Sequence, residues 1–156
     1  MLKDKRGISP VITTVILVAV GIALAVAIGL WMSGLVSTFT RFEKLEITSA
    51  YAIANTTNNT WKVYVTAKNT GSADATITSV LINGIPDSNW KNDSATIDPS
   101  PSSSPVTINV GSEQTFTITL YKGKQIGSTT LTSGITINIV LHSAAGKDYP
   151  SSVTLP

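Results

Sequence analysis

The residues that most often carry catalysis or bind metals are sparse in this chain. His142 is the single histidine and there is no cysteine, which excludes a Cys–His pair and a metal cluster built on these residues. Asp87, Asp93 and Asp98 do not have the spacing of a calcium-binding loop. No general base is placed beside a serine that would act as a nucleophile. We therefore expect no enzymatic activity, no cofactor and no metal site.

Three Asn-X-Ser/Thr sequons make Asn55, Asn58 and Asn92 candidate sites of N-glycosylation. Their number is uninformative, because a region this rich in asparagine, serine and threonine contains about three sequons by chance. All three fall in stretches that we expect to be loops, where an acceptor asparagine is accessible. The position of the sequons, and not their number, is what favours glycosylation.

The N-terminal part of the chain is dominated by one apolar run. Residues 8–40 contain no Asp, Glu, Lys, Arg or His. As a helix, the run would reach about 45–50 Å, whereas a bilayer core needs about 30 Å. It is also longer than the apolar region of about 7–15 residues in a secretory signal peptide. We therefore expect a helix over residues 8–44 that spans the membrane, with Lys3, Lys5 and Arg6 holding the N-terminus in the cytoplasm.

The composition of this helix favours contact with other helices. Ser9 is a suitable N-cap and Pro10 is tolerated in a first turn, so we expect the helix to begin there. Small residues then recur at every fourth position, a spacing that lets helix backbones approach closely in an apolar medium. The alternative is that glycine and alanine are simply frequent in membrane helices. The small-residue stripe, as we name this row, consists of Gly21, Ala25, Gly29, Ser33 and Ser37.

The start of the apolar run resembles that of a known family. A short basic leader ends in Arg-Gly, and residues 6–12 read RGISPVI before the long apolar helix. This arrangement resembles archaeal type IV pilins, which carry a class III signal peptide. The resemblance implies that a prepilin peptidase removes the leader, residues 1–7, on the cytoplasmic face. The implied processing site consists of Arg6, Gly7 and Ile8.

The resemblance is to one branch of a larger superfamily. Bacterial type IV pilins carry a glutamate early in the mature helix, and Ile12 occupies that place here. The glycine-rich start that is typical of archaeal flagellins is absent, so the resemblance favours a pilin over a motility filament. Mature subunits of this family bundle their N-terminal helices in the core of an extracellular filament and carry β-rich heads outside. We expect the same organisation here.

From Leu45 onward the sequence alternates between apolar and polar residues, as β-strands do. In the expected strand 75–83, Ile77, Ser79 and Leu81 would share one face. About seven short strands separated by turn signals predict an immunoglobulin-like antiparallel β-sandwich head over residues 45–156, and hence an α+β fold class. The clearest strands are expected over residues 45–54, 61–68, 75–83, 113–121, 135–140 and 149–155.

The charges, tryptophans and proline-rich loop of the head indicate what it could contact. After residue 47 the basic and acidic side chains balance, so no basic patch predicts a nucleic-acid partner. We expect Trp61 to fill the sandwich, Trp31 to be a core or interface aromatic, and Trp90 to be exposed and available for adhesion. The loop 98–105, DPSPSSSP, is either an adhesive or glycan-bearing loop or a plain connector.

Together these features predict a structural filament subunit. We expect an extracellular archaeal type IV pilus-like filament that polymerises through the N-terminal helix and serves surface adhesion. Its partners would be other copies of itself, a prepilin peptidase and the pilus assembly machinery, and the precursor would lie in the cell membrane. The alternative is a monomeric, membrane-anchored immunoglobulin-like binding module on the cell surface.

Overall fold

The computed structural model describes residues 10–39, 41–91 and 93–156. It divides the chain into a helical unit that ends at Arg41 and a head that begins at Phe42. The helical unit holds one apolar helix, and the head is built from antiparallel sheets. The fold class is therefore α+β, as the sequence predicts.

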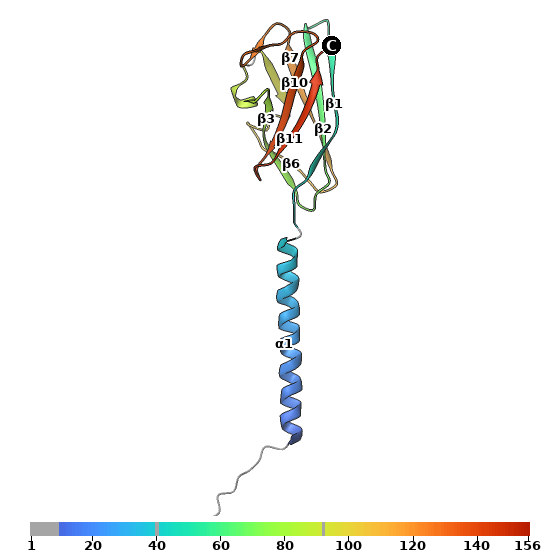
Figure 1. Cartoon of the computed structure of the whole chain (residues 1–156), viewed down its shortest axis with the longest axis vertical. Helices are drawn as coiled ribbons and strands as arrows, with labels where there is room; N and C mark the ends of the chain where they lie inside the picture. Colours follow the sequence, from blue (N-terminus) through green and yellow to red (C-terminus); the bar gives the residue numbers. More distant parts are fainter. Residues whose placement is uncertain (1–9, 40, 92) are drawn as a thin grey trace, which may run out of the picture. The chain divides into compact units, whose positions relative to one another are not determined.

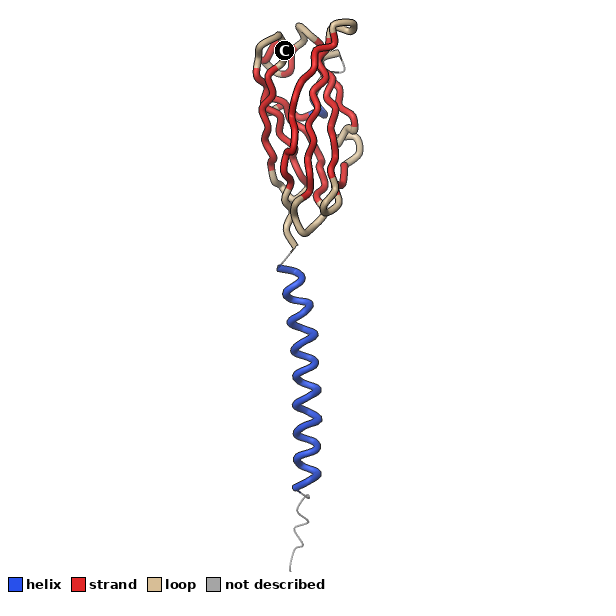
Figure 2. The backbone as a smooth tube through the Cα atoms, turned by 90° about the vertical axis from the view of Figure 1, so that its right-hand side faces the viewer, coloured by secondary structure: helices blue, strands red, loops and turns tan. Residues whose placement is uncertain are grey.

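Helix α1 (Pro10–Phe39) is a single run of 30 residues, drawn as an unbroken coil in Figure 2. It begins at the proline that the sequence indicates, and it ends before the predicted limit of residue 44. Its side chains are exposed from residue 10 to residue 36, and Trp31 is 67% exposed, so this tryptophan belongs to no core within the chain. The segment Pro10–Val36 is long and apolar enough to cross a membrane.

Strands fill most of the head, and each strand expected from the alternating pattern is present. The structure adds short strands that the sequence did not indicate, because two to four residues are too few to show a period of two. The elements of the head are β1 (Leu45–Asn55), β2 (Thr60–Asn69), β3 (Ala75–Ile82), β4 (Ile85–Pro86), the 3₁₀ turn η1 (Asp87–Asn89), β5 (Ala95–Asp98), β6 (Val106–Ile108), β7 (Glu113–Tyr121), β8 (Gln125–Ile126), β9 (Thr129–Thr130), β10 (Thr136–Ser143) and β11 (Asp148–Thr154).

The longer strands form two antiparallel sheets (Figure 1). The first sheet has the order β1-β2-β7-β5, and the second has the order β11-β10-β3-β4, with β6 also paired to β3. Strands β8 and β9 form a separate hairpin. The turn between β3 and β4 is the Asn83-Gly84 pair, and both residues have positive φ angles, 50° and 83°, as a tight hairpin requires.

One hydrophobic core lies between the two sheets. Trp61 of β2 and Phe116 of β7 are 1% and 0% exposed, and they belong to the same cluster as Ile77 of β3 and Ile139 of β10. The indole Nε1 of Trp61 donates a hydrogen bond of 2.8 Å to the carbonyl oxygen of Pro156, so its polar atom is satisfied. Burying each large side chain stabilises the head by about 1.5–3 kcal/mol. The prediction that Trp61 fills the core is confirmed.

The prediction of which β3 residues face the core is wrong for the second half of the strand. Ile77 is buried, but the next buried residues are Val80 and Ile82, while Ser79 and Leu81 lie outside the core. The register explains the change: His142 of β10 pairs with Ser79, and the following residue, Ser143, pairs with Ile77. Thr78 is therefore the extra residue of a β-bulge, which reverses the in–out alternation beyond it.

The beginning of the head is held by the turn that follows β2. The backbone N–H groups of Thr70 and Gly71 donate to the carbonyl oxygen of Lys44, and those of Ser72 and Ala73 donate to that of Phe42. Asn69, which is fully buried, fixes this turn through its side-chain amide. Residues 42–44 are therefore part of the head, which starts earlier than the predicted residue 45.

Candidate functional site

The structure describes some of the sites predicted from the sequence and leaves others undescribed. The proposed processing site, Arg6, Gly7 and Ile8, lies outside the described residues, and so does the acceptor Asn92. Cleavage after Gly7 therefore stays a prediction. The remaining sites lie on α1 and in the turn between β1 and β2.

The small-residue stripe lies on α1 and curves around it. The backbone there leaves room on the stripe, since nothing lies within 4 Å of a side-chain carbon added at Gly21 or Gly29. Ala25 and Ser33 are exposed, and Ser37 falls within the bounds of the same helix. A row at every fourth residue advances by about 40° per step around the helix. Small residues at this spacing permit close packing of two helices in membranes, at a crossing angle of about −40°.

The two described sequons meet in the turn between β1 and β2. Asn55 is half-buried and is the last residue of β1, not a loop residue as predicted, whereas Asn58 is exposed in the turn. The backbone N–H of Asn58 donates a 3.3 Å hydrogen bond to Oδ1 of Asn55. The sequon of Asn55 ends at the exposed Thr57, but that of Asn58 ends at Thr60, which is 3% exposed. Asn55 is therefore the acceptor whose hydroxyl residue is accessible in the folded head.

The single histidine is paired with a carboxylate on the neighbouring strand. Nδ1 of His142 lies 2.6 Å from Oδ1 of Asp148, and Ser79 is the register partner of His142 on the other side. Ser79, His142 and Asp148 thus lie side by side on three neighbouring strands, an arrangement that the sequence did not indicate. The hydroxyl of Ser79, however, donates to Asp87 at 3.0 Å. These three residues thus lack the hydrogen bond from the serine hydroxyl to the histidine ring that a catalytic triad needs.

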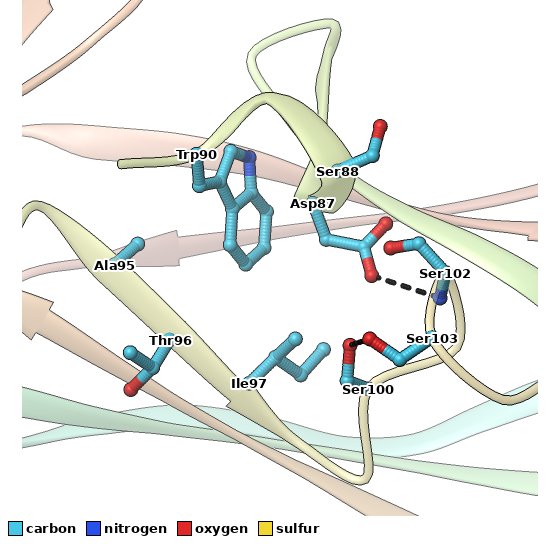
Figure 3. A pocket seen from close by; sticks show the side chains of 9 residues that line it. All are labelled: Asp87, Ser88, Trp90, Ala95, Thr96, Ile97, Ser100, Ser102 and Ser103. Atoms are coloured by element: carbon cyan, nitrogen blue, oxygen red, sulfur yellow. Dashed lines mark hydrogen bonds between the residues drawn. The ribbon is translucent and has the colours of Figure 1, made fainter. Parts of the chain in front are cut away.

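A pocket lies between β5, the edge strand of the first sheet, and the segment that follows β4, the last strand of the second sheet. It has a volume of about 420 Å³ and is bounded by η1 and Trp90, by β5, and by the loop that follows β5 (Figure 3). This loop is the predicted adhesive or connecting segment, and it is free of regular structure between Asp98 and Val106, as expected. We name this cavity the serine pocket, whose principal lining residues are Asp87, Ser88, Trp90, Ile97, Ser100 and Ser103.

Asp87 holds three segments of the chain around the serine pocket. Its Oδ1 accepts hydrogen bonds from the hydroxyl of Ser79 at 3.0 Å and from the backbone N–H of Val80 at 3.2 Å. Its Oδ2 accepts a hydrogen bond of 3.2 Å from the backbone N–H of Ser102. The carboxylate thereby joins β3, η1 and the loop after β5, and it fixes the walls of the pocket.

Trp90 forms one wall of the pocket, and the prediction that it is exposed is wrong. Its side chain is 9% exposed, and its Nε1 donates a 2.9 Å hydrogen bond to the carbonyl oxygen of Ile85. Its neighbours in sequence, Pro86 and Asn89, suggested a solvent-exposed loop. The short strand β4 and the turn η1 instead fold the indole back against the core.

The loop after β5 is closed by hydrogen bonds of its own. The backbone N–H groups of Ser103 and Ser104 donate to the carbonyl oxygen of Ser100, at 3.2 and 3.0 Å. The hydroxyls of Ser100 and Ser103 lie 3.2 Å apart, as the dashed line in Figure 3 marks. The hydroxyls of Ser100 and Ser103 therefore lie together at the cavity, and backbone hydrogen bonds fix the loop that carries them.

The ionisable groups with shifted pKa values lie outside the serine pocket. The hydrogen bond from Lys124 lowers the pKa of Asp93 below its ordinary value of 3.8, and the hydrogen bond from Lys44 lowers that of Glu46 below 4.5. Burial raises the pKa of Tyr149 above 10.0. Within the described part of the chain, no three His, Cys, Asp or Glu side chains are grouped in a way that could hold a metal ion.

Comparison with models of known protein families gave no match to this chain. A search of curated proteins gave no match either.

Proposed function

We propose that this protein is the structural subunit of an extracellular, archaeal type IV pilus-like filament that polymerises through α1 and serves surface adhesion. In this proposal a prepilin peptidase removes residues 1–7 from a precursor in the cell membrane. The N-terminus of that precursor is cytoplasmic and its head is outside. The assembled core consists of α1 helices, and the heads cover it.

The uncovered apolar surface of α1 is the observation that carries the proposal. The helix exposes large apolar side chains all around its axis, such as Leu17 at 72%, Ile22 at 61% and Leu30 at 72%. A helix that is apolar on every face is not stable when it is exposed to water, so it needs lipid or other helices around it. Lipid meets this need in the precursor, and sister helices would meet it in a filament.

The length of α1 favours sister helices over lipid as the final surroundings. A helix of 30 residues measures about 45 Å, whereas about 20 residues suffice to cross a bilayer. The small-residue stripe adds support, because small residues every four positions allow helices to approach closely without a hydrophobic driving force.

We also propose that the head is an immunoglobulin-like sandwich of the constant type. Strand order supports this assignment. The seven main strands, counted along the chain from first to seventh, are β1, β2, β3, β5, β7, β10 and β11. In this count the first sheet has the order first, second, fifth, fourth. The second sheet follows the order seventh, sixth, third. These are the ABED and GFC orders of the immunoglobulin fold. The chain departs from antibody domains in having no cysteine for an inter-sheet disulfide.

The alternative function is a monomeric binding module anchored in the membrane. The segment Pro10–Val36 favours it to the extent that it meets the requirements of a single membrane span. The two functions differ in the state of the leader and in the surroundings of α1. An anchored monomer keeps its helix in lipid and has no need of cleavage before Ile8.

Material sheared from the cell surface tests the proposal directly. We expect N-terminal sequencing to begin at Ile8 and near-atomic imaging to show α1 helices packed together in the centre of a filament. Sheared material is the right sample because a membrane anchor stays with the cell. Recovery of the protein only as single molecules extracted by detergent, with residues 1–7 attached, would support the anchored monomer instead.

A further inference from the structure

We propose that the serine pocket binds a neutral saccharide. The inference concerns the head alone. It does not depend on whether α1 lies in a filament or in lipid, because every lining residue belongs to the unit that starts at Phe42.

The size of the serine pocket is appropriate for a small ligand. Its volume of about 420 Å³ falls in the range of about 300–1,000 Å³ that is typical of ligand sites. It lies beside an edge strand of each sheet, β5 on one side and the end of the β3–β4 hairpin on the other. Loops at such edges are free to carry recognition, since the core does not depend on their side chains.

The polar groups of the pocket match a ligand with many hydroxyls. Ser100 and Ser103 supply two hydroxyls that lie 3.2 Å apart, and a hydroxyl can both donate one hydrogen bond and accept others. Asp87 adds a carboxylate, which only accepts when ionised, and its Oδ2 carries one observed hydrogen bond and so has a lone pair left for a ligand hydroxyl. A saccharide presents both donors and acceptors on neighbouring carbons, so it can satisfy this mixture.

Charge excludes the main competing ligand classes. Among the described residues, Asp87 is the only charged one that lines the pocket, and no lysine, arginine or histidine is found there. An anion such as a phosphate or sulfate ester would meet a negative carboxylate without a compensating cation. A divalent cation would find one carboxylate, whereas calcium takes six to eight oxygen ligands, usually from several acidic groups. The lining therefore disfavours anions and divalent metal ions, and a ligand rich in hydroxyls can use the carboxylate and the serine hydroxyls together.

The apolar part of the lining suits the carbon face of a sugar ring. The side chain of Ile97 is half-buried in the middle of the pocket, and the indole of Trp90 stands across from it (Figure 3). Binding sites combine apolar walls of this kind with a few fixed polar groups that orient the ligand. A pyranose has both surfaces, because C–H groups cover its faces and hydroxyls project from its edge.

The pocket is held in shape before any ligand arrives. Asp87 bonds to Ser79, Val80 and Ser102, and Trp90 bonds to Ile85. Walls that are already fixed lose little conformational entropy on binding, which increases affinity for a given set of contacts.

Saturation-transfer NMR on the full chain tests the inference. The protein is kept in a detergent without a sugar headgroup, and four probes are added one at a time: the methyl glycosides of glucose, mannose, galactose and N-acetylglucosamine. We expect transfer to at least one probe. In Ser103→Tyr, which places a ring in the cavity, we expect the affinity for that probe to fall at least about tenfold, the loss that one or two missing hydrogen bonds would cause.

A matched variant separates the pocket from the loop. Ser104 follows Ser103 and is exposed, but it does not line the cavity, so Ser104→Tyr should leave the affinity unchanged within about twofold. Ser103→Ala serves as a second variant, which removes one hydroxyl without adding bulk and should weaken binding by about tenfold or less. Absence of transfer to all four probes with a folded head would overturn the inference. Equal affinities of Ser103→Tyr and Ser104→Tyr would overturn it as well.

Discussion

The two regions of this protein place apolar side chains in opposite environments. In the head, Trp61 is 1% exposed and Ile118 is 0% exposed, whereas Trp31 in α1 is 67% exposed. The head thus buries most of its large apolar residues within its own chain, whereas the chain leaves those of the helix exposed. The apolar core of the head therefore forms within one chain, whereas α1 leaves its apolar surface open to whatever surrounds it.

The same difference is visible in how each region is patterned. Alternation along β2 assigns Val63 and Val65 to the core and Lys62 and Tyr64 to the outside. Along α1 no such choice is made, because residues 10–39 carry no charged side chain on any face. A helix that is apolar all round is suited to a medium that is apolar all round. Substitutions that act on one region only test whether the helix and the head are independent.

The largest effect is expected from bulk on the small-residue stripe. Gly29→Leu should leave membrane insertion and the head intact but abolish filament assembly, because a large side chain at this position separates neighbouring helices. Filament yield in sheared material, measured against the amount of protein in the membrane fraction, checks this outcome.

Gly34→Leu is the matched control for the stripe. It adds the same side chain about 140° further around the helix, at a glycine that also has nothing within 4 Å of an added side-chain carbon. We expect it to retain filaments. If both variants lose assembly equally, α1 still packs against other helices but the stripe is not the preferred contact; wild-type yield from Gly29→Leu would argue against the stripe altogether.

A large loss of stability is expected when the core of the head is opened. Trp61→Ala removes a fully buried ring and the hydrogen bond from its Nε1 to Pro156. Deleting a buried aromatic side chain costs about 3–5 kcal/mol, so calorimetry should show a markedly lower unfolding temperature. Trp31→Ala, the same change in the exposed region, should leave the unfolding of the head unchanged. Similar losses in the two variants would break the contrast between the regions.

Much of this fold could be predicted from local patterns, and the exceptions have identifiable causes. The strands of the core follow from alternation, and Pro10 marks the start of α1 because proline is tolerated in a first turn. The face of β3 was misjudged because the bulge at Thr78 is set by pairing with β10, which is distant in the sequence. Periodicity within one strand cannot reveal a register shift that its partner imposes.

The serine pocket could not be predicted for a related reason. Asp87 and Ser102 are fifteen residues apart, and the hydrogen bond between them exists only after the hairpin and β5 are in place. The sequence did single out the serine-rich loop 98–105, but it did not connect that loop with Asp87 or Trp90. Composition identifies a loop that is rich in hydroxyl groups, whereas the residues that this loop contacts follow from the arrangement of the two sheets.

A moderate effect is expected at the turn that holds the beginning of the head. An alanine side chain at Gly71 would lie 2.5 Å from the carbonyl oxygen of Phe42 and 2.6 Å from the backbone nitrogen of Lys44. Backbone atoms at this distance must shift, so Gly71→Ala should destabilise the head by about 1–3 kcal/mol. Urea unfolding of the full chain in detergent measures the change.

The same substitution in the helix sharpens the contrast. Gly34→Ala meets nothing within 4 Å, and alanine favours a helix by about 1 kcal/mol over glycine in water. We therefore expect no loss of stability in the head and equal or greater helicity of α1. An unchanged stability in Gly71→Ala would mean that residues 42–44 are not held by this turn.

The smallest effect is expected from acid, and it should be confined to the head. Residues 10–39 contain no titratable side chain, whereas Asp93 accepts a 2.9 Å hydrogen bond from Nζ of Lys124 that lowers its pKa below 3.8. A pKa that is lower in the folded state gives stability that is present above the unfolded pKa and lost as the pH falls through the folded pKa. The contribution of this pair should therefore start to fall at about pH 4 and be lost only when the pH is below the lowered pKa of Asp93 in the folded head.

Asp93→Asn isolates this contribution. The thermal midpoint of the variant should lie slightly below that of the wild type at neutral pH, because both side chains are exposed and solvent screens the pair. The difference between the two proteins should vanish as the pH is lowered, and Lys124→Gln should show the same pH profile. A difference that persists unchanged at low pH would mean that the ion pair is not its source. Loss of α1 helicity over the same pH range would show that the two regions are not independent in acid.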